Sequence, residues 1–328
     1  MQPLRDWRHG KVYGIMIEII NTGWLSLIVD NGRYGFADIG VPTSAPLDRY
    51  AFHAVNYLSG NPIDAPAIEV VGTEFAFRTD VDITCVITGA KVSASNDGGP
   101  VKPWTPFKAK KGSIVEIEKV VEGFRYYVGF SGVMAFEKVI GSYSTNIECR
   151  FGGLNGRPLM RGDIIEFCDV KTGEWRTLQD EYIPSMNPPH RLRIINGPEM
   201  GHFTRDSIKR FFEWQETPPF LVSARTNRTG IRLDGRPLVF RAGAEKSIIS
   251  EGILPGTIQI PGDGVPIIML HERTIGGYAR IAMVAKADLD LLAHLKPKDA
   301  VFFKSVTVDE AELLWKRKQE NIAFMYHD

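Results

Sequence analysis

The sequence predicts a mainly-β protein in which β-barrel modules follow one another, with only a few short helices. Short runs of β-branched and apolar residues alternate with turns along most of the chain. The 32 glycines and 20 prolines separate these runs. Two segments, 160–167 and 295–303, each pass through a short turn ending in aspartate into an apolar run. This repetition indicates two similar modules in tandem, and many short strands with glycine- and proline-rich turns are typical of barrels.

The expected strands are short, because each apolar run is soon interrupted by a turn residue. Many of these apolar runs are rich in valine and isoleucine, whose side chains pack well on a pleated surface. In chain order we expect strands at residues 17–20, 25–29, 81–87, 114–117, 126–130, 163–167, 192–195, 221–223, 231–233, 257–260, 266–270, 279–285 and 300–304.

Four segments instead have the spacing of an amphipathic helix. The first has Asp48 near its start and a Gly-Asn-Pro stop after residue 59. The second starts on Thr204, a residue suited to a helix N-cap. The last has acidic residues in its first turn and basic residues after them, as the helix dipole favours. The expected helices are residues 46–59, 204–214, 287–295 and 308–324.

The chain has one candidate domain boundary. Residues 177–189 contain Pro184, Pro188 and Pro189 and show little periodicity. We therefore predict an N-terminal extension at residues 1–15, a first β-barrel module at 16–180, a second at 190–305, and a helical tail at 306–328.

Composition excludes several classes of function. A hydrophobic content of 44% is enough for packed cores, so the chain as a whole is not disordered. The 39 basic and 39 acidic residues cancel, so no global field favours nucleic acid or an anionic membrane. No apolar window is long enough to span a bilayer. The three cysteines have no metal-binding spacing, and we expect reduced, mostly buried thiols, no metal site and a cytoplasmic location.

Segment 250–281 is the richest in candidate functional residues. Turns containing Gly264 and the Gly276-Gly277 pair surround polar residues that a plain hairpin does not need. Glycines beside charged side chains indicate backbone that comes close to a ligand. Gln259 could face inward and hold a ureido or lactam group, or face outward on a half-exposed strand. Glu251 is either a ligand contact or a residue at the strand entry.

Arg228, in the segment TNRTGIRL, is the second candidate. An arginine fixed on a turn is suited to bidentate capture of a carboxylate or phosphate, and we expect such a residue to contribute little to folding. The alternative is a surface arginine that ties a loop to an acid. His271, Glu272 and Arg273 form a third candidate group, because a His-Glu-Arg run can support acid–base or anion chemistry.

These segments carry a resemblance to a known family. The matching stretches are SEGILPGTIQIPGDGVPI with IGGY, VDNGRYGFADIGVPTSAPLDRY near the N-terminus, TGA at 88–90, GSYST at 141–145, GGLNGRPLMRGDII at 152–165 and RTNRTGIRLDG at 225–235. They follow in the right order over roughly residues 16–310 and resemble the family named after the carboxyltransferase domain of urea carboxylase. That family includes the C subunit of bacterial 5-oxoprolinase, proteins labelled allophanate hydrolase subunit 2, and an antagonist of a sporulation kinase inhibitor.

The resemblance implies two cyclophilin-like β-barrel domains and a subunit of an ATP-dependent enzyme. That enzyme would open the lactam of 5-oxoproline, or a related small-molecule amide, with a B-type carboxyltransferase subunit and possibly an A-type subunit as partners. Two alternatives stay open: a non-catalytic protein that sequesters a kinase-inhibitor partner, and carboxyl transfer from carboxybiotin on another chain. ATP is implied without an identifiable site, since the sequence has no phosphate-binding loop motif, and no biotin-carrier motif is present.

The resemblance, together with the chemistry of the His-Glu-Arg run, gives the candidate site residues. Gln259, Arg273 and His271 are the catalytic candidates. The candidates for substrate binding are Arg228, Glu251, Gly276, Gly277, Tyr278, Asp30, Arg33, Ser44 and Asp48.

Several of the positions depart from the family pattern or have simpler roles. Family members usually carry Asp at His271, Gln at Arg273 and Thr at Ile275, which marks a divergent member. Asp48 could serve only as an acid at a helix N-terminus, and Ser44 only as a cap.

Overall fold

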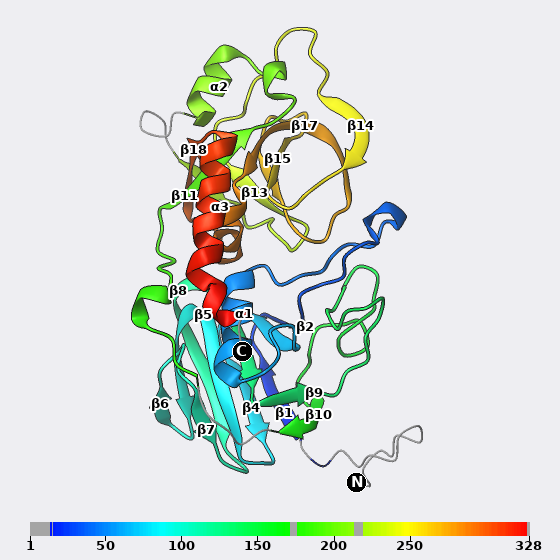
Figure 1. The fold of residues 1–328 in the computed structure, drawn as a ribbon. Helices are drawn as coiled ribbons and strands as arrows, with labels where there is room; N and C mark the ends of the chain where they lie inside the picture. The colour runs from blue at the N-terminus through cyan, green and yellow to red at the C-terminus, as the bar shows by residue number, and fades with distance from the viewer. Residues whose placement is uncertain (1–13, 15, 171–175, 213–218, 327–328) are drawn as a thin grey trace. The chain divides into compact units, whose positions relative to one another are not determined.

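The computed structural model describes residues 14, 16–170, 176–212 and 219–326. The chain divides into two compact units. Unit 1 comprises residues 1–33 and 44–185, and unit 2 comprises residues 34–43 and 186–328. Each has its own sheet, so the mainly-β prediction is confirmed (Figure 1). The predicted extension 1–15 lies outside the described residues apart from residue 14.

Unit 1 is built on a strongly curled sheet that forms a half-barrel. Its strand order is β2-β3-β8-β4-β1-β10-β9, and β5 pairs with β6, β7 and β8. The strands are β1 (Met16–Thr22), β2 (Leu25–Val29), β3 (Ala67–Val71), β4 (Phe75–Thr79), β5 (Ile83–Asn96), β6 (Gly99–Val101), β7 (Phe107–Ala109), β8 (Ile114–Phe130), β9 (Gly132–Met134) and β10 (Ile164–Val170).

The core of unit 1 lies inside this curl. Phe77, Phe130 and Phe167 stack edge to face there, with ring centroids 5.1 and 5.6 Å apart. Helix α1 (Arg49–Ser59) packs against β5 and β8. It begins at Asp48, whose carboxylate accepts a hydrogen bond from the Ala51 N–H, as an N-cap does. A 3-10 turn, η2 (Asp180–Tyr182), precedes the end of the unit.

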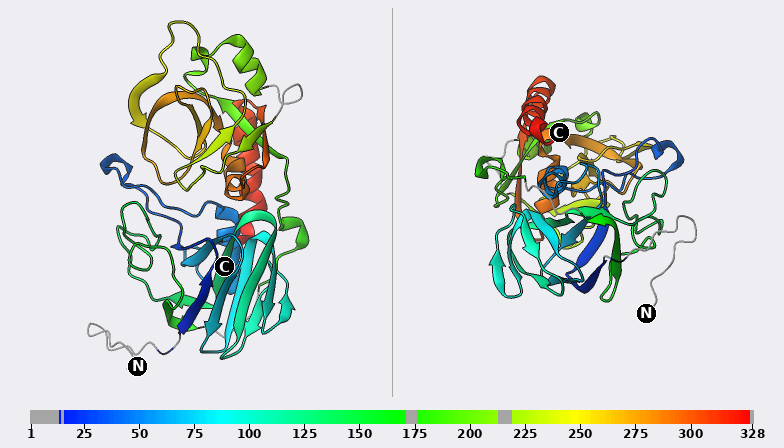
Figure 2. Two further views of the ribbon diagram at one scale, coloured as in Figure 1. Left: turned by 180° about the vertical axis from the view of Figure 1, so that it is seen from behind. Right: turned by 60° about the horizontal axis from the view of Figure 1, so that its bottom comes forward.

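Unit 2 contains a closed barrel of seven strands (Figures 1 and 2). The order β11-β18-β12-β13-β16-β15-β17 closes because β11 also pairs with β17, and β14 adds to β17. The strands are β11 (His190–Asn196), β12 (Phe220–Val222), β13 (Gly230–Asp234), β14 (Ser247–Gly252), β15 (Thr257–Ile260), β16 (Ile267–Met269), β17 (Ile275–Val284) and β18 (Ala300–Ser305).

Helices cover one side of the barrel. Helix α3 (Val308–Ile322) starts with a capping box between Thr307 and Glu310 and packs against β11 and η4 (Lys286–His294). Helix α2 (Arg205–Phe212) packs against β18, where Phe211 stacks on Phe303. Three short 3-10 turns complete the unit: η1 (Ala37–Ile39), η3 (Met200–His202) and η5 (Ala323–Met325).

The structure differs from the sequence expectations in several elements. Residues 114–117 and 126–130 belong to one long strand, β8. Residues 287–294 of the expected helix 287–295 fall in a 3-10 helix rather than an α-helix. The expected strands do not include β3, β4, β6, β7, β9 and β14. Only Cys85 is buried, whereas Cys149 and Cys168 are exposed, so the expectation of mostly buried thiols is wrong. Among the described residues, no helix is long and apolar enough to cross a membrane.

Candidate functional site

In unit 1, Asp30 lies at the centre of a dense hydrogen-bond cluster. Its carboxylate accepts the hydroxyls of Ser142 (2.5 Å) and Ser144 (2.8 Å) and the backbone N–H groups of Gly32 (2.9 Å) and Tyr143 (2.7 Å). These bonds join the end of β2 to the segment 141–145, more than a hundred residues later. Asp30 therefore holds that segment in place, which is a positioning role within the structure.

Arg33 anchors the same segment. Its side chain is only 1% exposed, donates to the Ser144 carbonyl at 2.6 Å and stacks over Phe151 at 4.6 Å. Gly152 makes the close approach possible, because it has a φ of +71° and a Cβ there would collide with the Ser144 carbonyl. Whether Asp30 and Arg33 also contact substrate stays a prediction.

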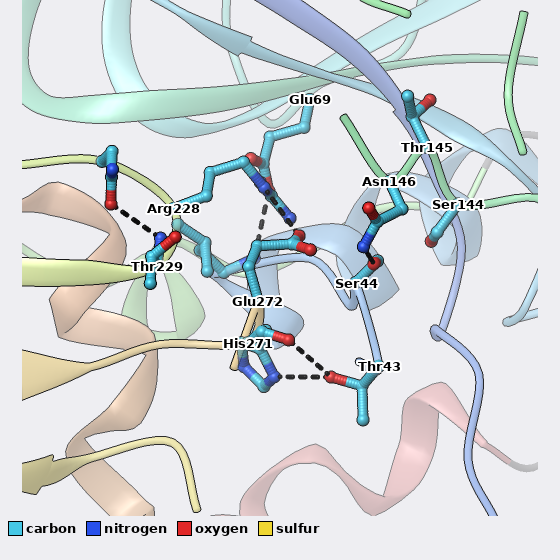
Figure 3. Close-up of polar contacts among 12 residues, drawn as sticks. Thr43, Ser44, Glu69, Ser144, Thr145, Asn146, Arg228, Thr229, His271 and Glu272 are labelled. Carbon is cyan, nitrogen blue, oxygen red and sulfur yellow. Dashed lines mark hydrogen bonds and ion pairs between the residues drawn. The ribbon is translucent and has the colours of Figure 1, made fainter. Parts of the chain in front are cut away.

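Ser44 and Asp48 have different local roles. Asp48, not Ser44, is the cap of α1. Ser44 is fully buried with a φ of +48°, a strained conformation for a residue other than glycine, and its hydroxyl accepts a hydrogen bond from Asn146 Nδ2 at 2.9 Å (Figure 3). Strain of this kind gathers at functional sites, and Ser44 remains a candidate for substrate binding.

A buried acid that the sequence did not single out lies close to α1. Glu69 on β3 is 1% exposed and accepts the Tyr127 hydroxyl at 2.8 Å and the Leu47 N–H at 3.0 Å, while Arg125 Nε lies 3.8 Å from its other oxygen. Burial, together with the charge of Glu69, raises the pKa of Tyr127 well above its usual value. Tyr127 therefore stays neutral and acts as a donor to Glu69.

In unit 2, Arg228 forms a buried ion pair with Glu272. Arg228 Nε lies 3.2 Å from Glu272 Oε1, and each side chain is 7% exposed (Figure 3). The turn before β13 is organised by Asn227, whose Oδ1 accepts the N–H groups of Thr229 and Gly230. Arg228 precedes β13 and Glu272 follows β16, and these two strands pair with each other. Arg228 is therefore not a surface residue, and its burial against an acid predicts a larger contribution to stability than the sequence suggests.

His271 lies next to Glu272 and contacts Thr43. Thr43 Oγ1 is 3.2 Å from His271 Nδ1 and 3.4 Å from the His271 carbonyl oxygen (Figure 3). Thr43 belongs to the segment 34–43, which comes from the N-terminal half of the chain but lies in unit 2. Nothing in the local sequence indicates that this segment reaches the second barrel.

The Gln259 side chain faces inward and not towards solvent. It is 3% exposed, and its Nε2 donates to the Tyr278 carbonyl at 3.4 Å. A Cβ on Gly276 would collide with this same Nε2, so the glycine is required for the amide to lie there. Gly277 lies against Ser250 on β14. The structure therefore brings Gln259, Gly276, Gly277 and Tyr278 together.

Glu251 takes part in a series of ion pairs next to Gly276, with which it pairs across β14 and β17. Arg280 binds both oxygens of Glu199 at 2.7 Å and also Glu251 at 3.0 Å. The hydrogen bonds from Arg280 lower the pKa of Glu199 below its usual value. The Glu251 side chain is 57% exposed, and Arg273 is exposed to solvent.

No group of three or more His, Cys, Asp or Glu side chains suited to a metal ion occurs in the described part of the chain. The polar groups of unit 2 include an inward amide (Gln259), a buried arginine paired with a carboxylate (Arg228 with Glu272), and an imidazole (His271). Such a set can bind and orient an amide or a carboxylate and can move a proton.

Known proteins of similar sequence include a subunit of 5-oxoprolinase and a part of urea amidolyase. The chain is 30% identical to the C subunit of 5-oxoprolinase from Escherichia coli over 321 residues, which cover 93% of this chain and 100% of that protein. It is 31% identical to urea amidolyase of Saccharomyces cerevisiae, covering 91% of this chain and only 17% of that protein.

Solved structures agree with these relatives. The urea amidolyase of Kluyveromyces lactis superposes with a TM-score of 0.88 at 25% identity, over 95% of this chain and 20% of that one. The urea carboxylase of the same yeast gives 0.86 at 25% identity, over 94% and 29%. Residues 39–305 match the model of a family described as carboxyltransferase domain, subdomain A and B, and the chain belongs to that family.

Proposed function

We propose that this chain is a subunit of a multi-subunit, ATP-dependent amidohydrolase of the 5-oxoprolinase type. One observation carries the proposal: the similarity extends over the whole length of the C subunit of 5-oxoprolinase, whereas it covers a small fraction of urea amidolyase. Similarity to an entire separate subunit supports the same role for this chain. Its partners are a B-type carboxyltransferase subunit and an A-type subunit.

Unit 2 supplies groups for a cyclic amide that carries a carboxylate. Gln259 is buried and able to donate and accept, so it orients the amide. Arg228 binds the carboxylate, and Glu272 fixes the direction of its guanidinium. His271 transfers the proton, and the N–H groups around Gly276 and Gly277 stabilise the negative charge that develops on oxygen.

The residues of this chain fit a small amide better than they fit a triphosphate. Neither unit shows, in its described residues, a glycine-rich turn between a strand and a helix with a lysine beside it. We therefore assign ATP binding to the partner subunits. Biotin is not carried by this chain.

The test is reconstitution. The chain is purified alone and after co-expression with its B-type and A-type partners, and glutamate release from 5-oxoproline with ATP is measured. We expect turnover from the complex and none from the chain alone. In the complex, Gln259→Glu should lower kcat/KM by ~10- to 150-fold, the range for a lost hydrogen bond to a charged or developing charged group. Turnover by the chain alone, or none by the complex, would overturn the proposal.

The alternative with structural support is carboxyl transfer from carboxybiotin on another chain. It is favoured by the TM-scores of 0.88 and 0.86 against urea amidolyase and urea carboxylase. The same complex, supplied with urea, a biotinylated carrier, and a biotin carboxylase that carboxylates the carrier from bicarbonate and ATP, distinguishes the two. Biotin-dependent consumption of bicarbonate would support transfer, and avidin should then abolish it, whereas avidin should not affect opening of 5-oxoproline.

A further inference from the structure

We propose that Gln259 presents its side-chain oxygen, rather than its nitrogen, to the ligand, so that this part of the site selects a ligand with an N–H group, such as a lactam, over an ester of the same shape. The identity of the lactam as 5-oxoproline rests on the proposed function, whereas the preference for an N–H group does not.

The nitrogen of the Gln259 amide is already used within the protein. Gln259 Nε2 lies 3.4 Å from the Tyr278 carbonyl oxygen, and that oxygen can only accept a hydrogen bond. The reverse orientation of the amide would place two acceptors against each other, so the nitrogen is the atom that faces Tyr278. The same nitrogen also fills the space that the missing side chain of Gly276 leaves open.

The oxygen of the amide has no such partner. Gln259 is 3% exposed, yet within the described part of the chain no group donates a hydrogen bond to its Oε1, and this oxygen is not completely enclosed. Buried side-chain oxygens nearly always accept a hydrogen bond, because leaving one unmatched costs free energy. An N–H group of a ligand supplies the missing donor, whereas the ring oxygen of an ester cannot.

The strands around Gln259 hold the amide in this orientation. Gly276 on β17 pairs with Glu251 on β14, and Arg280, four residues further along β17, pairs with Gln259 on β15. Residues opposite each other on neighbouring strands project from the same face, so Glu251, Arg280 and Gln259 share one face of the sheet. Arg280 Nη1 lies 3.0 Å from Glu251 Oε2, while its Nε and Nη2 each lie 2.7 Å from an oxygen of Glu199. These ion pairs fix β14 against β17 and keep Gly276 next to the amide nitrogen.

The arrangement divides the recognition of a lactam between two groups. The ring of a lactam holds its amide in the cis form, so that the N–H and C=O groups point to the same side of the ligand. Gln259 Oε1 accepts from the N–H group. The lactam oxygen is then left to the backbone N–H groups around Gly276 and Gly277, which the proposed function assigns to the developing negative charge.

The test compares two rings that differ in one group. Pyrrolidinone carries an N–H group, and γ-butyrolactone has an oxygen in its place. Each is titrated into the full chain, and binding is followed by NMR of isotope-labelled protein. We expect pyrrolidinone to bind ~2- to 10-fold more tightly, the range set by one net hydrogen bond. In Gln259→Leu the two rings should bind equally, whereas Gln319→Leu, a control that replaces an exposed glutamine on α3, should keep the wild-type preference.

Equal affinities for the two rings in the wild type, no binding of either ring, or a preference that survives in Gln259→Leu would overturn the inference. The comparison in the wild type needs no variant, so it decides the question even if Gln259→Leu does not fold.

The same comparison in the complex, without ATP, separates this inference from the proposed function. The ligands are 5-oxoproline and its lactone analogue, 5-oxotetrahydrofuran-2-carboxylate. If the complex opens 5-oxoproline when ATP is added but binds both ligands equally, the orientation of Gln259 is wrong and the proposed function stands. If the complex neither binds nor opens 5-oxoproline, while the chain keeps its Gln259-dependent preference for pyrrolidinone, the proposed function is wrong and the selection of an N–H group stands.

Discussion

Replacing Arg228 with alanine removes the cation of a buried ion pair and leaves the Glu272 carboxylate in a place where only 7% of its side chain is exposed. Breaking a buried pair from one side costs ~3–5 kcal/mol, and losing a hydrogen bond to a charged group costs ~1.5–3 kcal/mol. The contact between the two side chains, Nε to Oε1, is 3.2 Å long. We therefore expect a loss of ~3 kcal/mol, at the boundary of these ranges.

The loss is measurable by calorimetry and by urea titration followed by circular dichroism. For a unit of this size, ~3 kcal/mol lowers Tm by ~6–12 °C. Arg225→Ala is the control, because Arg225 lies three residues away but its pair with Asp234 is 73% and 54% exposed. Arg225→Ala should lower the free energy of unfolding by no more than ~1 kcal/mol.

A double-mutant cycle separates the pair from other contacts of either residue. Arg228→Ala, Glu272→Ala and the double variant are compared, and the double variant should be more stable than the sum of the single losses predicts, since neither charge of the pair is then left behind. Arg228→Lys should recover only part of the stability, because lysine lacks the planar guanidinium. A coupling energy below ~0.5 kcal/mol would refute the reasoning, because independent sites add to within that value.

Three further predictions concern other parts of the fold. Gly276→Ala should displace the Gln259 amide and lower the activity of the complex at least ~10-fold, as one lost hydrogen bond to the reacting amide would. Gly252→Ala is the control and should leave the activity unchanged, because a Cβ there would lie in open space. Equal losses in both variants would count against a role of Gly276 in placing the Gln259 amide. Burial lowers the pKa of His190 despite its hydrogen bond to Asp299. The folded protein therefore has its full stability above the unfolded-state pKa of ~6.5, and its unfolding free energy decreases as pH falls below that value. His190→Gln should make the unfolding free energy depend less on pH between pH 7 and 5, and an unchanged pH dependence would contradict this. Thr307→Ala should cost ~1 kcal/mol in urea titrations through loss of the α3 cap, whereas Thr307→Ser should cost almost nothing, and equal losses would argue against capping.

The local sequence alone is enough to predict the strands and helices that are bounded by clear turn or cap residues. Two β-branched runs on either side of Gly262-Asp263-Gly264 predict β15 and β16, and both are strands. Asp48 and the glycine stop predict helix α1, and it ends at Ser59 with Gly60 in a left-handed conformation. These features depend on residues within a few positions of one another.

Elements that depend on distant partners are not predictable in this way. β8 continues through residues 118–122, three of which are charged (Glu118, Lys119 and Glu122), because β5 pairs with it along nearly its whole length. β14 has almost no buried side chain and is a strand only because β17 lies beside it. The pairing of strands far apart in sequence overrides the local preference of each segment.

The candidate site divides in the same way. The sequence by itself identified the residue types, the glycine turns and the family, because these are local patterns. The tertiary structure decided that Gln259 faces inward, that Arg228 is buried against Glu272 and that the segment with Thr43 reaches His271. Each of these facts joins residues 19 to 228 positions apart. The burial and the partner of a polar side chain are fixed by which strands meet, and that is a property of the folded chain as a whole.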